Sequence, residues 1–455
     1  MELSGEVGSH TLGYDVASPL ESVLSGESLK DGQGSRKLTS GIIFLSMDDF
    51  DLENKTIFVR VDINIPLDPS TLQILDDTRI RAIGPTLADL RSSKVVIGSH
   101  QSRPGRIDFT SLEPHARRLQ RYCSQKVKYS DDVFGPHARQ AIKQVQSGEI
   151  LVLDNLRFCA EENMDCTPEM AAKTHMVKRL APLFDLFVND AFGTAHRSQP
   201  SLIGFAQVLP TVAGRLMERE LSALNRVLVK TERPSVFVLG GAKVEDKLPV
   251  IEHVFRSGRA DKVLLGGIPA KTFLMAKGLK LGQKNEQEMK TLEEYVEKAK
   301  NVLRDFPDRV EVPSDLAILK NEKRQEIMTE ELPTGEIIMD IGRKTTDRFL
   351  EEIGKAKTVV ASGPLGIFEK SGFDYGTRNV LEAISNCDGY TVIGGGHLTG
   401  LASMMGIEEK VSHLSTAGGA MLSLLAGERL PVVDALERAA ERFRSGRMSL
   451  QQNAA

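Results

Sequence analysis

From residue 57 onward, short apolar stretches alternate with amphipathic ones, and this alternation predicts strands and helices in turn. A strand is predicted over 57–65, where a period of two places Arg60, Asp62 and Asn64 on one face and apolar side chains on the other. Further apolar stretches are typical of buried parallel strands. They span 94–99, 150–153, 186–189, 236–239, 262–265, 358–361 and 390–393.

Helical periodicity or charge patterning predicts helices over 79–90, 213–230, 244–255, 285–306 and 432–444. Strands that alternate with helices predict an α/β fold of two doubly wound parallel-sheet (Rossmann-like) domains. We interpret 46–212 as an N-terminal domain, 213–230 as a connecting helix and hinge, and 231–431 as a C-terminal domain. Residues 432–455 are expected to form a C-terminal helix and tail. The Gly/Ser-rich residues 1–45 predict a disordered extension.

The amino-acid composition of the chain argues against several classes of protein. The chain has 455 residues and a net charge of -4, which argues against a protein held on nucleic acid by bulk charge. It has no apolar run of about 18 residues, so no membrane-spanning segment is expected. The four cysteines show no metal-binding spacing and are typical of reduced thiols, which favours a cytoplasmic protein.

Arginine and histidine recur in the loops that follow the predicted strands. Carboxyl ends of parallel strands share one edge of a sheet, so these side chains are expected to converge on one small anion. They are Arg79, His100, Arg103, Arg157, His196 and Arg197. The alternative is that each arginine pairs separately with a surface carboxylate.

A second candidate site follows the predicted strand at 236–239. Gly240 and Gly241 allow the backbone to approach a ligand closely, and Lys243 and Lys247 project from one face of the next helix. A helix N-terminus with two ammonium groups favours phosphate binding. The alternative is an ordinary turn with two solvated lysines. The chain has no Walker-type motif, and its candidate G-x-G-x-x-G fails at Thr399, which disfavours a P-loop kinase and a Rossmann dehydrogenase.

Six motifs in order resemble those of the phosphoglycerate kinase family, archaeal type. The resemblance covers about residues 47–443. The motifs occupy 60–66, 100–105, 154–158, 189–197, 240–247 and 363–369. Each motif alone is weak, whereas the ordered set is specific.

The resemblance implies phosphoryl transfer between ATP and 3-phosphoglycerate, with Mg²⁺, by a monomer or a homodimer. It implies that the substrate contacts Asp62, Ile63, Asn64, Arg79, His100, Gln101, Ser102, Arg103, Arg157 and Arg197. The nucleotide would contact Lys243, Lys247, Glu369, Gly394, Gly395, Gly396 and His397. Arg79, Lys243 and Lys247 would serve in catalysis.

The chain departs from the family pattern on the nucleotide side. His397 stands where most relatives carry an aspartate associated with the metal, and Mg²⁺ prefers oxygen ligands, so we assign no metal ligand. Ser362 and Ala417 also differ from the usual residues. These changes leave open a non-catalytic paralogue that binds phosphoglycerate or nucleotide. A kinase that acts on a different small acid is a further alternative.

Overall fold

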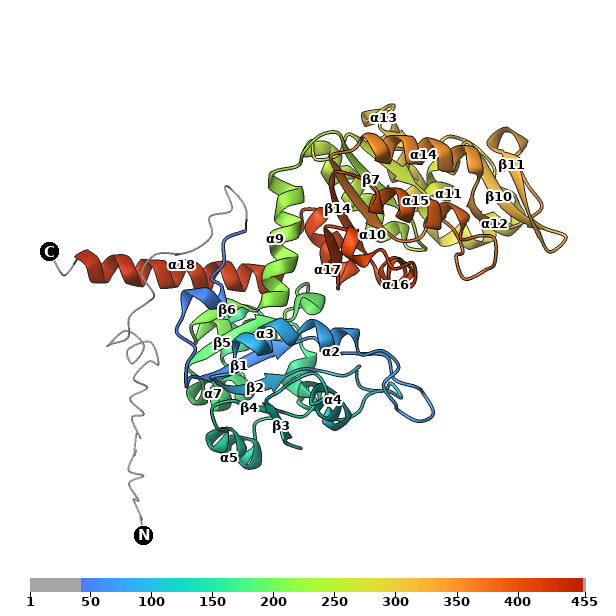
Figure 1. The fold of residues 1–455 in the computed structure, drawn as a ribbon. Helices are drawn as coiled ribbons and strands as arrows, with labels where there is room; N and C mark the ends of the chain where they lie inside the picture. The colour runs from blue at the N-terminus through green and yellow to red at the C-terminus, as the bar shows by residue number, and fades with distance from the viewer. Residues whose placement is uncertain (1–41, 453–455) are drawn as a thin grey trace, which may run out of the picture.

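The computed structural model describes residues 42–452 and contains two six-stranded parallel sheets in two lobes (Figure 1). The first sheet has the order β3-β4-β2-β1-β5-β6 and the second β15-β14-β13-β7-β8-β9. The strands of the first are β1 (Thr56–Val61), β2 (Lys94–Gly98), β3 (Lys126–Tyr129), β4 (Glu149–Val152), β5 (Leu186–Asp190) and β6 (Thr211–Ala213). Those of the second are β7 (Ser235–Leu239), β8 (Lys262–Leu265), β9 (Val310–Glu311), β13 (Thr358–Ser362), β14 (Tyr390–Gly394) and β15 (His413–Ser415).

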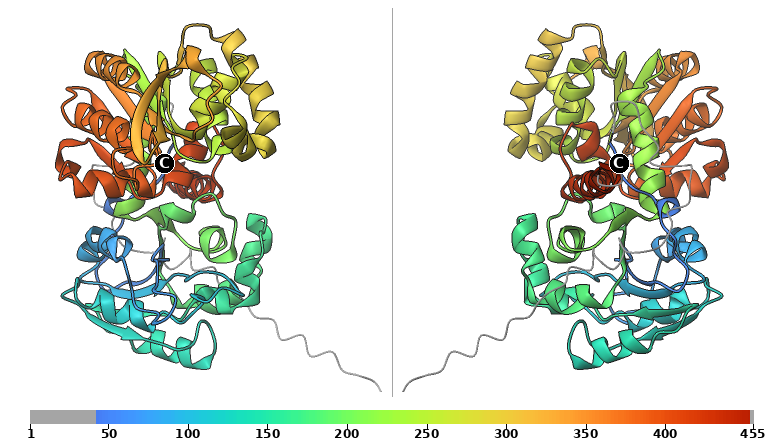
Figure 2. Two further views of the ribbon diagram at one scale, coloured as in Figure 1. Left: turned by 90° about the vertical axis from the view of Figure 1, so that its right-hand side faces the viewer. Right: turned by 90° about the vertical axis from the view of Figure 1, so that its left-hand side faces the viewer.

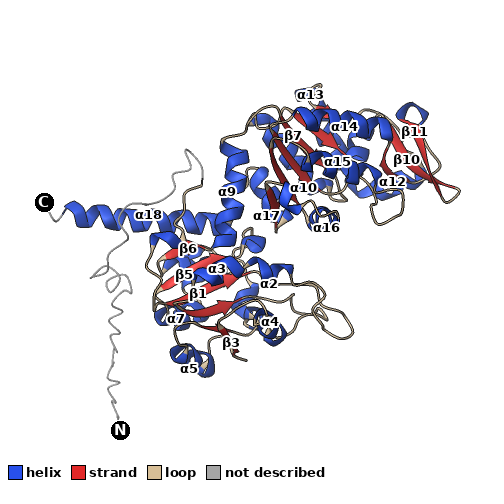
Figure 3. Ribbon diagram, in the orientation of Figure 1, coloured by secondary structure: helices blue, strands red, loops and turns tan. Residues whose placement is uncertain are grey.

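Helices flank both sheets (Figure 3). The N-terminal lobe contains α2 (Thr78–Ala82), α3 (Gly84–Asp89), α4 (Glu113–Leu119), α5 (Pro136–Gln144), α6 (Pro168–Ala172), α7 (His175–Leu180) and α8 (Pro200–Ile203). Helix α9 (Arg215–Val229) connects the lobes. The C-terminal lobe contains α10 (Val244–Arg256), α11 (Gly267–Ala276), α12 (Gln283–Met289), α13 (Glu293–Asp305), α14 (Arg343–Lys355), α15 (Tyr375–Ser385), α16 (Gly396–Met404) and α17 (Gly418–Leu425). The predicted fold class, two doubly wound parallel-sheet domains, is confirmed.

Each central strand is buried on both of its faces. In β1, Ile57 and Val59 pack in one apolar cluster, and Phe58 packs in another. In β7, Val236 and Phe237 are divided between two clusters in the same way. Because both faces are covered, these strands are continuous apolar runs in the sequence, which is why they were predictable.

The predicted strand 57–65 is shorter in the structure. β1 ends at Val61, and the backbone N–H groups beyond it bond to side chains instead of a neighbouring strand. Ile63 N donates to Ser99 Oγ at 3.2 Å, and Ile65 N donates to Gln101 Oε1 at 3.1 Å. These loop contacts replace the strand ladder, so the strand predicted over 57–65 is wrong beyond Val61. The predicted alternation persists, because Val59, Val61 and Ile63 pack in one apolar cluster.

Three other predictions are corrected. The helix predicted over 79–90 is two helices, α2 and α3, because Pro85 occupies the first turn of α3. The helix predicted over 285–306 divides into α12 and α13 around a short turn at Lys290–Leu292. An antiparallel sheet in the order β11-β10-β12 was not predicted. Its strands are β10 (Asp315–Lys320), β11 (Lys323–Met328) and β12 (Ile338–Ile341).

The first described residues and the last helix both pack on the N-terminal lobe. Figures 1 and 2 show α18 (Pro431–Gln452) beside this lobe, where Ala440 joins the β1 cluster and Arg442 Nη1 donates to Gln207 O at 2.9 Å. Most of the extension predicted over 1–45 lies outside the described residues, and Leu45 is buried. Within the part that the structure describes, we find no helix long and apolar enough to cross a membrane.

A buried carboxylate ties the connecting helix to the C-terminal lobe. Glu220 of α9 is fully buried, and its Oε2 lies 2.8 Å from His413 Nε2 of β15. Its Oε1 accepts from Thr416 N at 2.7 Å and Thr416 Oγ1 at 2.8 Å. Burial alone would raise the pKa of Glu220, but these hydrogen bonds hold the pKa below its usual value. The bonds fix α9 to the turn that precedes α17.

We expect Glu220→Ala to lower stability by about 3–5 kcal/mol, because it leaves His413 and Thr416 without their buried partner. The matched control is Glu232→Ala, which removes an exposed ion pair with Arg226 and is expected to cost about 0–1 kcal/mol. Differential scanning calorimetry of both variants checks the difference. Equal shifts in Tm would contradict it.

Candidate active site

Loops that follow β1, β2, β4 and β5 meet at the carboxyl edge of the first sheet. Arg79 Nη1 lies 2.7 Å from Asp62 Oδ2 and donates to Asn64 O at 3.1 Å. Asn64 Oδ1 accepts from Ser102 N at 2.9 Å. The Asp62 side chain packs against Gly193, where a β-carbon would collide with Oδ2. The network joins groups from three loops and the start of α2.

The loops after β2 and β4 are bonded directly to each other. Gln101 N donates to Asn155 Oδ1 at 3.2 Å, and Asn155 Nδ2 returns a bond to Gln101 O at 2.9 Å. Arg157 Nη1 donates to Ser102 O. Ser102 has a φ of +57°, a backbone conformation that non-glycine residues adopt only when neighbouring contacts hold them there. Arg157 and Ser102 are therefore fixed as one unit.

Positive charge accumulates at this edge beyond what the carboxylates of Asp62 and Glu162 balance. Burial lowers the pKa of His100 well below its usual value, and the nearby guanidinium groups of Arg60, Arg157, Arg197 and Arg79 lower it further. His100 is therefore neutral at pH 7. Burial, together with Arg197 and Arg60, lowers the pKa of Arg157 to about 10. We call the site formed by Arg79, His100, Arg157 and Arg197 the basic basin. An anion that enters the basic basin would meet several desolvated hydrogen-bond donors.

His100 retains one unused ring nitrogen. Arg60 Nη2 lies 3.4 Å from His100 Nδ1. Arginine only donates, so Nδ1 accepts and the proton of the neutral ring sits on Nε2. His100 Nε2 is buried and has no hydrogen-bond partner among the described residues. It is a donor in need of an acceptor.

Sequence reasoning missed the support beneath this basin. Arg60 is fully buried, lies 3.8 Å from the buried Glu162 carboxylate and donates from Nε to Ser201 Oγ at 2.7 Å. Glu162 also accepts a bond from Ser201 N at 2.9 Å. No motif in the sequence pointed to Glu162, because it is more than 100 residues away from its partner.

The remaining predicted residues of this lobe lie in different environments. Ile63 and Gln101 are buried, and the Gln101 side chain bonds the Ile65 backbone. Arg103 is exposed, and its side chain makes no hydrogen bond or ion pair with the described residues. Arg197 Nε lies 3.4 Å from His196 Nε2.

The second candidate site is built from glycine turns at the carboxyl edge of the other sheet. Gly241 N donates to Pro364 O at 2.7 Å, so the turns after β7 and β13 are in backbone contact. A β-carbon on Gly240 would collide with Pro364 O. Gly363 has a φ of +82°, and a β-carbon there would lie 2.5 Å from Gly240 O. The sequence predicts that Gly240 allows the close approach of a ligand. In the structure, the absence of a side chain at Gly240 makes room for the neighbouring turn after β13.

The two predicted lysines lie at the start of α10 in unlike environments. Lys243 is the N-cap residue and is exposed. Lys247 is buried, and burial together with the Lys243 charge lowers its pKa. The Lys247 ammonium makes no hydrogen bond or ion pair within the described part of the chain. It is a desolvated cation beside a helix N-terminus, which favours phosphate.

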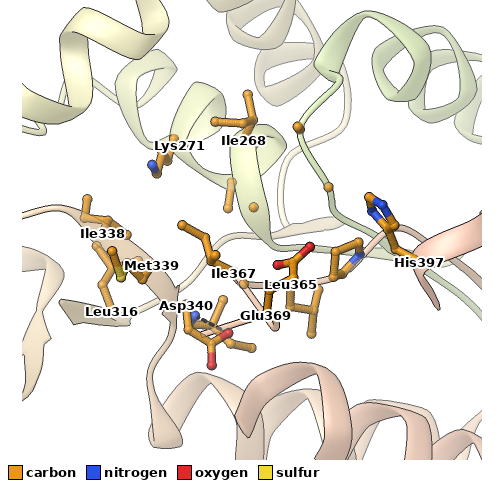
Figure 4. Close-up of a pocket in the computed structure, with 17 residues that line it drawn as sticks. Ile268, Lys271, Leu316, Ile338, Met339, Asp340, Leu365, Ile367, Glu369 and His397 are labelled. Atoms are coloured by element: carbon orange, nitrogen blue, oxygen red, sulfur yellow. Dashed lines mark hydrogen bonds between the residues drawn. The ribbon is translucent and has the colours of Figure 1, made fainter. Parts of the chain in front are cut away.

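A mainly apolar cavity of about 200 Å³ lies beside these turns. Figure 4 shows Glu369 among its lining side chains, with His397 at one edge and Leu316, Ile338 and Met339 toward the other. Of the predicted nucleotide residues, Glu369 and His397 line the cavity, whereas Lys243, Lys247 and the Gly394 to Gly396 turn do not. The apolar lining was missed, because β10 and β12 belong to the unpredicted sheet.

A second cavity, of about 260 Å³, is lined by both lobes. His196 lines it from the N-terminal lobe, and Glu245 and Asp246 of α10 line it with Glu428 from the C-terminal lobe. Burial and Arg197 lower the pKa of His196, against the opposing effect of Asp62 and Glu428. The basic basin and α10 therefore approach a shared space.

Comparisons with known proteins agree with this arrangement. The family model described as phosphoglycerate kinase matches residues 47–428. Phosphoglycerate kinase of Methanobacterium bryantii is 47% identical over 397 residues, which cover 86% of this chain and 97% of the relative. That of Pyrococcus horikoshii is 45% identical over 406 residues, covering 88% and 98%.

Solved structures give the same result. The crystal structure of phosphoglycerate kinase from Pyrococcus horikoshii OT3 matches with a TM-score of 0.81 and 44% identity, covering 87% of this chain and 99% of that one. The structure of phosphoglycerate kinase from Coxiella burnetii matches with a TM-score of 0.74 and 30% identity, covering 87% and 100%. The resemblance carried by the six motifs is confirmed, and the chain belongs to the phosphoglycerate kinase family.

Proposed function

We propose that this protein catalyses reversible phosphoryl transfer between 1,3-bisphosphoglycerate with ADP and 3-phosphoglycerate with ATP, in glycolysis and gluconeogenesis. The observation that carries the proposal is the convergence of Arg79, Arg157, Arg197 and neutral His100 at one sheet edge in a member of this family. The protein would act in the cytoplasm as a monomer or a homodimer.

The basic basin would hold 3-phosphoglycerate. Its phosphate and carboxylate groups are anions that would relieve the mutual repulsion of the arginines and satisfy His100 Nε2. Asp62 and Asn64 would accept from the substrate hydroxyl group or orient Arg79. We propose binding roles for the other predicted residues as well: Ile63, Gln101, Ser102 and Arg103.

The apolar cavity would hold the base and ribose of ATP or ADP. Its lining is mainly apolar, with Glu369 available as a hydroxyl acceptor for the ribose. The phosphates would then extend toward Lys243, Lys247 and the glycine turn at 394–396. Desolvated Lys247 would gain a counter-ion from the phosphates.

Mg²⁺ fits this proposal as part of the nucleotide substrate. Among the described residues, no three His, Cys, Asp or Glu side chains are grouped to hold a metal ion. His397, a nitrogen ligand, suits Mg²⁺ poorly. We therefore assign no protein ligand to Mg²⁺, and the ion would arrive bound to the nucleotide phosphates.

The proposed phosphoryl transfer requires mainly alignment of the two substrates and stabilisation of negative charge. The attacking group of 3-phosphoglycerate is a carboxylate that is already ionised at neutral pH, so no general base is needed. The transferring phosphoryl group would be stabilised by Arg79, Lys243 and Lys247 in a loose, in-line transfer. Closure of the lobes would exclude water, which otherwise hydrolyses the acyl phosphate.

Steady-state turnover of MgATP with 3-phosphoglycerate tests the proposal, and we expect Lys243→Ala to lower kcat by about 100- to 1000-fold. Loss of one preorganised cation at the transferring group accounts for this size. The matched control Lys277→Ala removes an exposed lysine at the end of α11 and should keep wild-type kcat. If the wild type binds both ligands by calorimetry without turnover, the protein is a binding paralogue and the proposed function fails.

Two arginines on α2 provide a sharper test of the substrate basin. Arg79→Ala removes the guanidinium that contacts Asp62, and we expect kcat/KM for 3-phosphoglycerate to fall by at least about 100-fold. Arg81→Ala, two residues along, removes an exposed pair with Asp77 and should leave it nearly unchanged. Similar losses in both variants would contradict the placement of the substrate.

A further inference from the structure

The antiparallel sheet supports the apolar cavity from behind. Leu316 of β10 and Met339 of β12 line this cavity, whereas β11 contributes none of the lining. Arg324 lies on β11, and its side chain is only 14% exposed. A mostly buried arginine outside the site needs partners, and those partners show what it holds.

Arg324 bonds to β12 and to the loop between β13 and α15. Its Nη1 donates to Asp340 Oδ2 at 2.9 Å and to Gly372 O at 2.9 Å. Its Nη2 donates to Ile341 O at 2.9 Å. The guanidinium also lies over the Tyr375 ring, 5.3 Å from the centroid. One planar group therefore bridges β12 and the far end of the loop.

Asp340 connects the Arg324 guanidinium to the wall of the apolar cavity. Its side chain is fully buried, and Asp340 is a lining residue. Oδ2 accepts from Gly376 N at 3.0 Å, and Oδ1 accepts from Ile341 N at 2.9 Å. Gly366 packs so closely on the carboxylate that a β-carbon there would collide with it. Burial raises the pKa of Asp340 to about 6, against the opposing bonds from Gly376 and Arg324.

The loop held in this way carries one side of the cavity. Leu365, Ile367 and Glu369 line the cavity from residues 363–374. Ile367 N donates to Met339 O at 2.7 Å, which fixes the first half of the loop to β12. Arg324 and Asp340 fix the second half at Gly372 and Gly376, so Glu369 lies between two tethers.

We propose that Arg324 is a positioning residue for nucleotide binding, which sets the loop of Glu369 and Ile367 through its bonds to Asp340 and Gly372. The proposal rests on the proposed function, since it takes the cavity as the nucleotide site. Arg324 touches no substrate. Its loss would widen the range of loop positions and so reduce nucleotide affinity, while the distant basic basin keeps its geometry.

The test compares Arg324→Met, Arg324→Lys and Arg343→Met. Arg343 is the matched control, because both arginines pair with Glu326 and lie over the Tyr375 ring. Unlike Arg324, Arg343 contacts neither Asp340 nor Gly372. We expect Arg324→Met to raise the KM for MgATP by roughly 10- to 100-fold and to change the KM for 3-phosphoglycerate less than about twofold. Arg324→Lys should recover part of the loss, and Arg343→Met should resemble the wild type.

Two further measurements make each outcome decisive. Thermal unfolding reports the folded fraction, and ADP affinity by calorimetry reports binding apart from turnover. The proposal is overturned if both KM values are unchanged, if both rise together, or if Arg343→Met gives the same loss. If the wild type binds ADP but shows no turnover, the proposed function is wrong. The ADP affinities of the Arg324 variants then still test the positioning role of Arg324. A wild type that binds no ADP overturns both.

Discussion

Direct backbone contact between glycine turns is the constraint on which the nucleotide side of the molecule depends. Gly240 N donates to Ser362 O at 2.9 Å, Gly267 N to Leu365 O at 2.9 Å and Ile268 N to the turn after β7 at 2.9 Å. No side chain fits between these turns. The starts of α10 and α11 and the loop with Glu369 thus form one unit, which contains the residues that we propose for binding the phosphates and the base.

The N-terminal lobe is subject to a different constraint, because its fold holds several arginine side chains close together in the absence of a bound anion. Arg60 is neutralised by Glu162 beneath the basin, and His100 avoids charge by remaining unprotonated. Burial, together with the neighbouring cations, keeps the pKa of Arg157 low. The repulsion that remains is the physical reason for anion affinity: a bound phosphate or carboxylate would remove a cost that the empty site carries.

The sequence predicted the parts of the fold that are governed by local pattern. Strands such as β7 and β8 were apolar runs because both of their faces are buried, and the amphipathic α9 was placed within two residues. β11 escaped prediction because it is charged and only partly buried, without a continuous apolar run, whereas the buried apolar run of β10 was overlooked. The position of β11 depends on long-range contacts of Arg324 that spacing along the chain does not encode.

The same division applies to the two sites. Motifs identified Arg157 and Lys243 because these residues lie in short loops directly after strands. Glu162 and the apolar cavity lining come from segments that approach only in the folded chain, so no motif contained them. What the sequence supplied was the chemistry at each strand end, and what it lacked was the packing that orients this chemistry.

The placement of the two sites on separate lobes makes the space between them part of the chemistry. Helix α10 presents Lys243 and Lys247 near the glycine turns, whereas Glu245 and Asp246 line the cavity opposite His196. A histidine whose pKa is lowered by burial therefore faces two carboxylates across this cavity. The bonds of Glu220 fix the connecting helix to the C-terminal lobe. A single buried carboxylate thus anchors the helix that joins the two lobes, and an in-line transfer would require the sites on those lobes to be aligned.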